Sequence, residues 1–221
     1  MFRIPNSGSS WSLAVAVMLF AGSALAKVQM NLYLMSKCPG KQHTQSTNNS
    51  IAVAAHWLKW IASIHVDYDN SNVLDLQFDY IGELSNSSRF GCFANIQHLC
   101  IQEYADADTA LKYILCQHQD VKKIGTYSQM AHCLIGNPTW LPATQCALGT
   151  EGIALLQNSV RSTREKNIST SLTFTLDGQT RCMFNSGHWV APEDGCPGGG
   201  SVPKFTESIR LLEKSKRRKK M

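Results

Sequence analysis

The sequence predicts an α/β domain, and the order of its elements is the reason. Two segments near the N-terminus alternate between apolar and polar residues, as strands do, and the segment between them has helical periodicity. A long, cysteine-bearing helical stretch follows, and the chain finishes with two short strand-like segments and an amphipathic helix. A strand–helix–strand unit implies parallel strands, and a hairpin followed by a helix can extend the same sheet.

The first half of the chain supplies the strand–helix–strand unit. Residues 28–35 and residues 73–82 alternate, with apolar side chains on one face, and both predict strands. Residues 51–64 have helical spacing and contain several good helix formers. The tryptophans of this helix, Trp57 and Trp60, are interpreted as packing residues.

The second half contains a helical block and then the hairpin. Three helices are expected, over 105–118, 127–134 and 152–164. Pro138 and Pro142 are expected to break the helical pattern between the second and the third. Strands are expected over 170–176 and 181–185, joined by the hairpin signal Asp177-Gly178-Gln179-Thr180. His188 and Trp189 are interpreted as space-filling. The terminal helix is expected over about 202–214.

The N-terminal segment is typical of a cleaved signal peptide. Arg3 supplies a positive charge, residues 11–22 form a short apolar run, and Ala24-Leu25-Ala26 is a small-x-small cleavage site. We therefore expect a signal peptide over 1–26, with an uncleaved anchor as the alternative. One domain over 27–213 would follow, with a helical insertion at about 92–165, and a basic tail over 214–221 would end the chain.

The charge distribution argues against a nucleic-acid-binding protein. The formal net charge is +5, but six positive residues lie within 214–220, and without them the balance is −1. Loss of Arg3 with the signal peptide leaves −2. The tail is interpreted as a solvated, frayed helix end, with an anchor for an anionic surface or a dibasic processing site as alternatives.

Cysteine content and sequons both agree with secretion. The even number of cysteines allows four bridges, but spacing does not choose among the many connectivities. The eight cysteines are Cys38, Cys92, Cys100, Cys116, Cys133, Cys146, Cys182 and Cys196. The Asn-x-Ser sequons are at Asn48, Asn86 and Asn167.

Other chemistries have weaker support. Cys116 and His118, with His132 and Cys133, have the residue types of a zinc site, but in a secreted protein such cysteines more often form disulfides. No metal is therefore expected. The sequence has no phosphate-binding glycine loop and no Gly-x-Ser-x-Gly or His-Glu-x-x-His motif, so no nucleotide or other cofactor is expected.

Three motifs resemble the gamma-interferon-inducible lysosomal thiol reductase family, in particular its fungal-type members. They are residues 33–39 leading into Cys38, residues 92–100 with the spacing cysteine, two residues, asparagine, four residues, cysteine, and residues 145–152. The C-terminal part, Arg181-Cys182 with Gly195-Cys196-Pro197-Gly198-Gly199, is similar too. The resemblance covers about 28–212. It implies a thioredoxin-like fold, in which a βαβ half joins a ββα half, here with a cysteine-rich helical insertion.

The sequence departs from that family at the residues that carry its chemistry. The family's active site has a pair of cysteines, whereas Cys38 has no such partner and Thr44 stands where a resolving cysteine would be. The first half of the family signature would fall on residues 85–88, which lack its cysteine, histidine and glycine. A cis-proline usually precedes the third strand of such a site, and no proline lies between Pro142 and Pro192.

The resemblance implies reduction of protein disulfides through one nucleophilic cysteine. Cys38 follows a strand and precedes a predicted helix, and Lys37 and Lys41 are cationic neighbours that would favour its thiolate. Without a resolving thiol, the mixed disulfide must wait for a small thiol or for the second sulfur of the substrate. The other seven cysteines are assigned to the scaffold. Because seven is odd, one of them, such as Cys92, could instead hold Cys38.

Two functions therefore remain open. The first is a thiol-disulfide oxidoreductase whose partners are disulfide-bonded proteins and a small thiol reductant, with no nucleic acid and no stable membrane insertion after signal cleavage. The second is a catalytically inactive, disulfide-rich interaction or structural module of the same fold. Both place the protein in the secretory pathway, in an extracellular, lysosomal or vacuolar compartment.

Overall fold

A computed structural model describes residues 27–34, 74–82, 93–120, 122–185, 188–190 and 202–220. The helix predicted over 51–64 and the signal peptide predicted over 1–26 lie outside the described residues. All statements about the structure below concern the described part of the chain.

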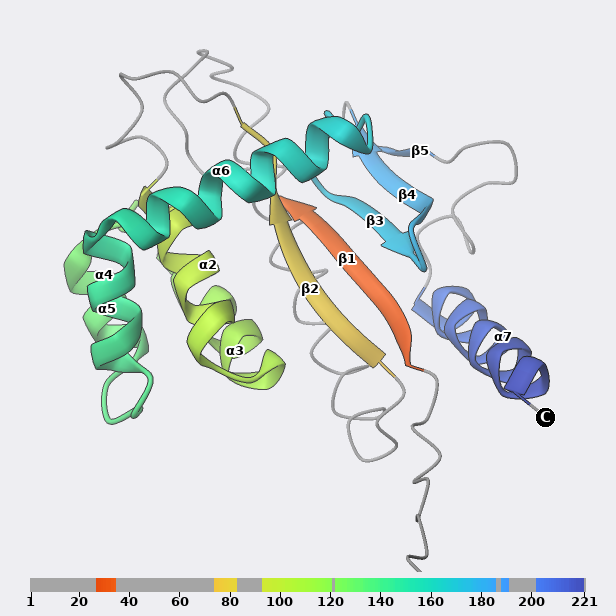
Figure 1. The fold of residues 1–221 in the computed structure, drawn as a ribbon, viewed down its shortest axis with the longest axis horizontal. Helices are drawn as coiled ribbons and strands as arrows, with labels where there is room; N and C mark the ends of the chain where they lie inside the picture. Colours follow the sequence, from red (N-terminus) through yellow and green to blue (C-terminus); the bar gives the residue numbers. More distant parts are fainter. Residues whose placement is uncertain are drawn as a thin grey trace, which may run out of the picture.

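The centre of the fold is a mixed five-stranded sheet in the order β2-β1-β3-β4-β5 (Figure 1). The strands are β1 (Val28–Leu34), β2 (Leu74–Tyr80), β3 (Thr173–Leu176), β4 (Gln179–Asn185) and β5 (His188–Val190). β1 and β2 are parallel, and every later pairing is antiparallel. The strand pairing thus confirms the predicted parallel pair extended by a hairpin. β5 was not predicted, because His188 and Trp189 were interpreted as space-filling.

A two-residue turn joins β3 to β4. Asp177 and Gly178 have φ values of 49° and 77°, the left-handed conformation that a tight hairpin turn requires at both positions. The Asp177 carboxylate also accepts a hydrogen bond from the Gln29 backbone N–H at 3.0 Å, and the Asp177 N–H donates to the Gln29 carbonyl at 2.8 Å. The turn is therefore fastened to the start of β1 as well as to its own hairpin.

β1 is a central strand, and from Met30 onward it is buried on both faces. Its even-numbered residues are apolar and belong to the main core, as do the even-numbered residues of β2. The core continues to β3 and to α7 (Val202–Lys220), where the rings of Phe174 and Phe205 pack edge to face with their centroids 6.0 Å apart. Burial on both faces is typical of a parallel pair within an α/β sheet.

The predicted helical insertion is confirmed, and it contains two helices that were not predicted. It comprises α2 (Phe93–Tyr104), α3 (Ala107–Gln117), α4 (Tyr127–Cys133), α5 (Trp140–Leu148) and α6 (Thr150–Glu165). Figure 1 shows α2–α5 grouped beyond the β2 edge, with α6 crossing over the carboxyl ends of β1 and β2. The expectation that Pro142 breaks a helix was wrong. Pro142 is in the first turn of α5, where a backbone N–H has no partner within the helix.

Side chains from two helices close the outer edge of β2. The Gln102 side chain of α2 accepts from the Phe78 N–H at 2.7 Å and donates to the Phe78 carbonyl at 3.3 Å. The Tyr80 N–H donates to the Ser159 hydroxyl of α6 at 2.8 Å, and Thr163 donates to the Tyr80 carbonyl at 3.4 Å. These bonds replace the ladder that a neighbouring strand would provide, so this edge is not left open for pairing with another chain.

Gly152 brings α6 against the disulfide between α2 and α5. A Cβ atom at this position would lie 2.5 Å from Ile96 Cγ2, 2.7 Å from the Cys146 carbonyl oxygen and 3.1 Å from Cys100 Sγ. Only glycine permits this approach. Gly152 is the last residue of the 145–152 motif, one of those that carry the family resemblance. In the structure it makes a packing contact.

The basic C-terminal segment continues α7 as far as Lys220 rather than ending the helix near Lys214. The Lys216 ammonium donates to the Lys27 carbonyl at 2.7 Å and pairs with the Asp177 carboxylate. This part of the predicted tail is therefore held against the sheet. No helix within the described residues is both long enough and apolar enough to cross a membrane.

We predict that Ser159→Ala lowers the free energy of unfolding by about 1–3 kcal/mol, because it leaves the buried Tyr80 N–H without an acceptor. Denaturant unfolding of the oxidised protein measures this. Ser162→Ala is the matched control on the same helix, because no side-chain hydrogen bond of Ser162 is present in the described structure, and its effect should stay within about 0.5 kcal/mol. Equal losses in the two variants would contradict the role of Ser159.

We also predict that Gly152→Ala destabilises the protein by about 2 kcal/mol, because the added methyl group overlaps backbone and sulfur atoms that cannot move aside. Gly82→Ala is the control, because its Cβ would meet only Val160 Cγ2, at an ordinary 3.7 Å. Thermal unfolding of both variants measures the difference. A Gly152→Ala variant as stable as Gly82→Ala would show that α6 does not pack this closely.

Candidate functional site

The four residues predicted to carry the chemistry, Cys38, Lys37, Lys41 and Thr44, lie outside the described residues. The described structure contains the sheet edge from which that segment departs. β1 ends at Leu34, and its carbonyl accepts a hydrogen bond of 2.9 Å from the Ile81 N–H just beyond the end of β2. The carboxyl ends of neighbouring parallel strands are where open α/β sheets bind ligands.

Lys166 places a positive charge beside the end of β1. Its ammonium donates to the Tyr33 hydroxyl at 3.2 Å, lies 5.5 Å from the centre of the Tyr33 ring and is 3.7 Å from an Asp79 carboxylate oxygen. The Lys166 side chain is 44% exposed and the Asp79 side chain 17% exposed. An exposed pair of this kind adds little stability, so its main effect is the local electric field.

Asp79 is held from both sides. One oxygen accepts from the Ser159 hydroxyl at 3.1 Å, and the other accepts from the Asn31 amide at 3.2 Å. Asn31 also donates to Gln77 at 3.3 Å, so a polar row runs along one face of β1 and β2. The alternation of residues 73–82 predicted only that Asp79 lies on the polar face. Its contacts with Lys166 and Ser159 join segments about 80 residues apart, and no local pattern indicates them.

Leu172 occupies the position before β3 at which a cis-proline was considered. No peptide bond within the described residues is cis, and Leu172 has a φ of 60° although it is neither glycine nor asparagine. Its side chain is buried, and its N–H donates to the Tyr33 carbonyl at 2.8 Å. A bulky residue in the left-handed region costs about 1–2 kcal/mol. Leu172 thus lies beside the end of β1, and its backbone N–H is already hydrogen-bonded.

All five cysteines within the described residues are disulfide-bonded. Cys100 pairs with Cys146, and Cys116 pairs with Cys133. Cys182 is bonded as well, and its partner belongs to the remaining cysteines of the sequence, Cys38, Cys92 and Cys196. The scaffold role assigned to these five cysteines stays a prediction, because bonding alone does not separate a structural bridge from a redox-active one. Cys92 and Cys196 lie outside the described residues.

The Cys116–Cys133 bond also decides the zinc interpretation for these two cysteines. Their sulfurs are bonded to each other, and the described residues contain no group of three side chains that could hold a metal ion. His118 Nδ1 is 2.7 Å from the Ile114 carbonyl oxygen, and His132 is exposed. Of the three sequons, only Asn167 is described, and it is exposed in the turn after α6, where a glycan can be accommodated.

A buried polar network joins β2 to α2 and α3. His98 Nδ1 lies 2.7 Å from the Tyr80 hydroxyl, and the rings of His98 and Tyr113 pack edge to face. Gln117 donates to the Tyr113 hydroxyl at 2.7 Å. Burial lowers the pKa of His98 to about 3, with a smaller contribution from His118, so His98 is neutral at physiological pH.

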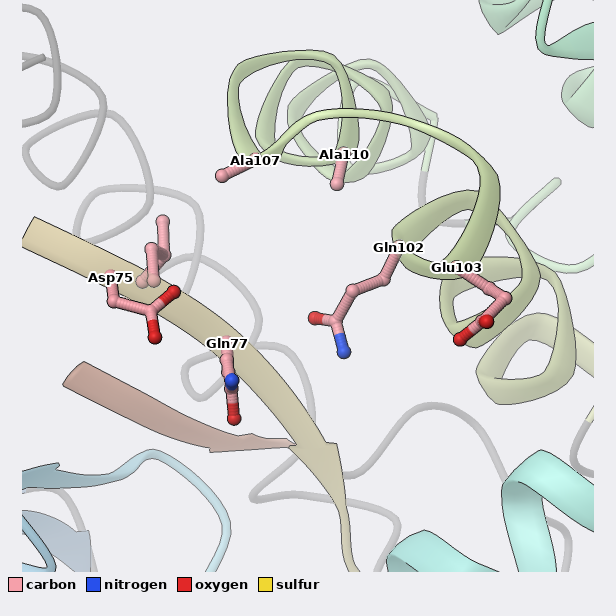
Figure 2. A pocket seen from close by; sticks show the side chains of 7 residues that line it. Asp75, Gln77, Gln102, Glu103, Ala107 and Ala110 are labelled. Atoms are coloured by element: carbon pink, nitrogen blue, oxygen red, sulfur yellow. The ribbon is translucent and has the colours of Figure 1, made fainter. Parts of the chain in front are cut away.

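One hollow in the described structure lies away from this edge. It measures about 330 Å³ between the first half of β2 and the helices α2 and α3 (Figure 2). Asp75 and Gln77 approach it from β2, and Gln102 and Glu103 from α2. It contains no cysteine and none of the predicted site residues, so thiol chemistry cannot be assigned to it.

We predict that acid destabilises the protein through His98. Between pH 6.5 and about 3 the unfolded chain binds a proton at this histidine that the folded protein does not, so stability falls as the pH falls through this window. From pH 7 to pH 5 the loss is about 2 kcal/mol. Denaturant unfolding at both pH values should show this loss in the wild type and a smaller one in His98→Asn. Equal losses would contradict the neutral, buried state of His98.

Comparison with known proteins supports the fold. No protein-family model matches the chain, and no curated protein matches it in sequence. Among solved structures, the oxidoreductase NmDsbA1 from N. meningitidis superposes with a TM-score of 0.51 at 14% identity, covering 88% of this chain and 86% of that chain.

Two further solved structures are similar at lower scores. Pseudomonas aeruginosa DsbA has a TM-score of 0.49 at 16% identity and covers 89% of this chain and 87% of its own. MdbA, a thiol-disulfide oxidoreductase from Corynebacterium diphtheriae, has a TM-score of 0.49 at 10% identity, with 83% of each chain covered. Together with the strand order and the helical insertion, the NmDsbA1 match shows that this chain has an α/β, thioredoxin-like fold.

Proposed function

We propose that this protein is a thiol-disulfide exchange protein of the secretory pathway, related to the gamma-interferon-inducible lysosomal thiol reductases, with Cys38 as its nucleophile. The observation that supports the proposal is that Cys38 follows β1 in the sequence of a chain with a thioredoxin-like fold. It follows the last residue of β1, Leu34, by four residues, and four residues span at most about 14 Å. We therefore expect Cys38 near the carboxyl ends of the parallel strands.

Local charge supports nucleophilic chemistry there. Lys166 lies on the ring of Tyr33 next to the end of β1, and Lys37 and Lys41 flank Cys38 in the sequence. Positive charge near a cysteine favours the thiolate, which is the attacking species. Asp79 opposes this effect in part, because it neutralises Lys166. The tuning would therefore come mainly from Lys37 and Lys41.

The disulfides support an oxidising compartment. Two complete bridges lie within the described helical block, and proteins of the cytosol seldom keep such bonds. The signal peptide and the glycans at Asn48, Asn86 and Asn167 belong to the same proposal.

The reaction would follow a single-thiol course. The Cys38 thiolate attacks one sulfur of a protein disulfide and forms a mixed disulfide, and the other substrate sulfur leaves as a thiolate. A small thiol then attacks the substrate sulfur of the mixed disulfide, so Cys38 leaves as a thiolate and the substrate carries the small thiol in a new mixed disulfide. A second small thiol breaks that bond, which leaves the substrate with two thiols and joins the two small thiols in a disulfide. No metal and no nucleotide takes part in these steps.

An inactive structural or interaction module is the alternative, and one observation favours it. Leu172 holds the strained position before β3, where a substrate-facing backbone is expected, and its N–H is already bonded to Tyr33. The state of Cys38 decides between the two functions. If the partner of Cys182 is Cys38, no nucleophile remains. A free thiol at Cys38 requires that Cys182 pairs with Cys92 or Cys196.

We predict that Cys38 reacts with a thiol-specific alkylating agent in the native, unreduced protein, and that the protein reduces insulin with a small thiol as electron donor. Mass spectrometry of peptides locates the adduct, and insulin turbidity at acidic and neutral pH gives the rate. Cys38→Ser should fall to the rate of the small thiol alone. Ser36→Ala, which removes a hydroxyl two residues earlier, should retain the wild-type rate.

We also predict that Thr44→Cys increases the rate of insulin reduction. A thiol at this position should resolve the mixed disulfide internally, so turnover rises and less enzyme is trapped on the substrate. Two results together would contradict the enzymatic function: a disulfide at Cys38 that survives mild reduction, and a wild-type rate of insulin reduction no higher than that of Cys38→Ser. They would favour the inactive module.

A further inference from the structure

The two disulfides of the helical block differ in their surroundings. Cys100 and Cys146 are 0% and 2% exposed and lie in the main core, where Gly152 of α6 packs against Cys100. Cys116 and Cys133 are only half-buried and join the ends of α3 and α4. An external thiol can approach the second pair without opening the core.

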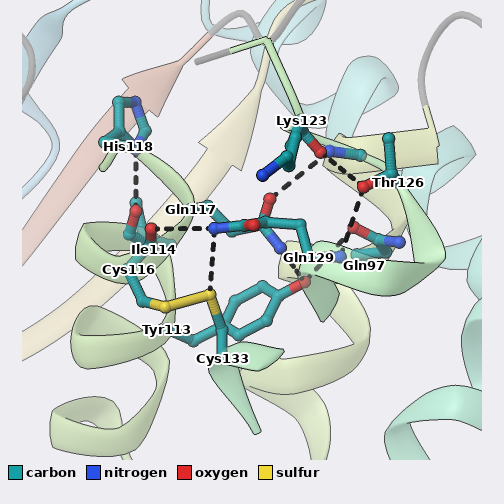
Figure 3. Close-up of a disulfide and its surroundings, with 11 residues drawn as sticks. Gln97, Tyr113, Ile114, Cys116, Gln117, His118, Lys123, Thr126, Gln129 and Cys133 are labelled. Carbon is teal, nitrogen blue, oxygen red and sulfur yellow. Dashed lines mark hydrogen bonds between the residues drawn. A yellow bond between two sulfur atoms is a disulfide. The ribbon is translucent and has the colours of Figure 1, made fainter. Parts of the chain in front are cut away.

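A hydrogen-bond donor points at the half-buried pair. Figure 3 shows the Gln129 side chain beside the disulfide, where its amide nitrogen lies 3.6 Å from Cys133 Sγ and 3.3 Å from the Cys116 carbonyl oxygen. Gln129 is itself 6% exposed, and its own N–H is capped by the Thr126 hydroxyl at 3.2 Å. The amide is thus fixed in place before any sulfur becomes charged.

The position of the pair makes this donor important. Cys116 is in the last turn of α3 and Cys133 is the last residue of α4, and the negative end of a helix dipole disfavours a thiolate. A charge that forms on Cys133 Sγ is therefore stabilised by the Gln129 amide rather than by its own helix. Within the described structure no side chain donates a hydrogen bond to Cys116 Sγ, so the two sulfurs are not equivalent.

Opening this bond would leave the core intact. The Cys116–Cys133 bond closes a local loop with a sequence separation of 17, whereas the Cys100–Cys146 bond spans 46. The loop between α3 and α4 has a second fastening, because the Gly125 N–H donates to the Gln117 side chain at 3.3 Å and Gln117 in turn donates to Tyr113. These hydrogen bonds would still fasten the loop if the Cys116–Cys133 bond were opened.

We propose that Cys116–Cys133 is a second redox centre, which accepts electrons from dithiols of peptide or protein substrates independently of Cys38. A substrate thiolate attacks Cys116 Sγ, the bond between the two protein sulfurs breaks, and Cys133 leaves as a thiolate bonded to the Gln129 amide. The second substrate thiolate then attacks the substrate sulfur of the mixed disulfide. The substrate is oxidised to a disulfide, and Cys116 and Cys133 are reduced and take up two protons.

The test uses the full chain carrying Cys38→Ser, so that it does not depend on the proposed nucleophile. The protein is incubated with a synthetic peptide that has two cysteines separated by two glycines, and free thiols are then trapped by acid quenching and alkylation. We expect Cys116 and Cys133 to be labelled together at least roughly tenfold faster than Cys100 and Cys146, because a buried bond reacts only after the core opens. The peptide should lose two mass units in step with this labelling.

Two sets of variants probe the mechanism. Cys116→Ala combined with Cys133→Ala should abolish peptide oxidation. If that variant fails to fold, Gln129→Leu serves instead and should slow opening of the Cys116–Cys133 bond roughly three- to tenfold, because the leaving thiolate loses its donor. Gln157→Leu, on the exposed face of α6, is the matched control and should leave the rate unchanged.

Two results would overturn the proposal. One is that both described bridges open at the same rate, or only together with loss of the circular dichroism signal, which would make Cys116–Cys133 a structural bond. The other is an unchanged rate in Gln129→Leu. Because Cys38 is absent throughout, either result leaves the insulin assay of Cys38 unaffected, and a failure of Cys38 chemistry leaves this test intact.

Discussion

The outer edge of β2 is the constraint on which the rest of the structure depends. The backbone groups of Phe78 and Tyr80 point away from the sheet and require partners, and Gln102, Ser159 and Thr163 supply them. These bonds attach α2 and α6 to the sheet through hydrogen bonds to its backbone, in addition to apolar packing. A thioredoxin-like core can in this way hold a long helical insertion as part of the same domain. The same Ser159 hydroxyl also orients Asp79 at the candidate site.

Where local pattern and long-range packing agree, the sequence was sufficient to predict the element. The alternation of β1 and β2, the hairpin signal at Asp177-Gly178 and the periodicity of α6 all correspond to elements of the structure. The prediction failed at α5, because a proline was interpreted as a break although the first turn of a helix tolerates it. It also missed β5, which is only three residues long and depends on pairing with β4.

The candidate site was predictable only in part. A cysteine that follows a strand, together with the resemblance to the thiol reductase family, indicated where chemistry would be expected. The contacts among Tyr33, Asp79 and Lys166 join three separate segments of the chain, and the sequence of no single segment predicts them. The strained conformation of Leu172 and the two disulfide pairings are likewise products of the folded chain. Spacing left many connectivities open, and proximity in the fold selects among them.

The two bridges of the helical block are nested, since Cys116 and Cys133 both lie between Cys100 and Cys146. A protease that cleaves beside the exposed residues Lys122 or Lys123 would therefore produce two fragments that remain joined by two covalent links. Such a nicked molecule would migrate as one species on a non-reducing gel and would keep its α2–α5 contact. This nesting would let the protein tolerate proteolytic cleavage at the turn between α3 and α4.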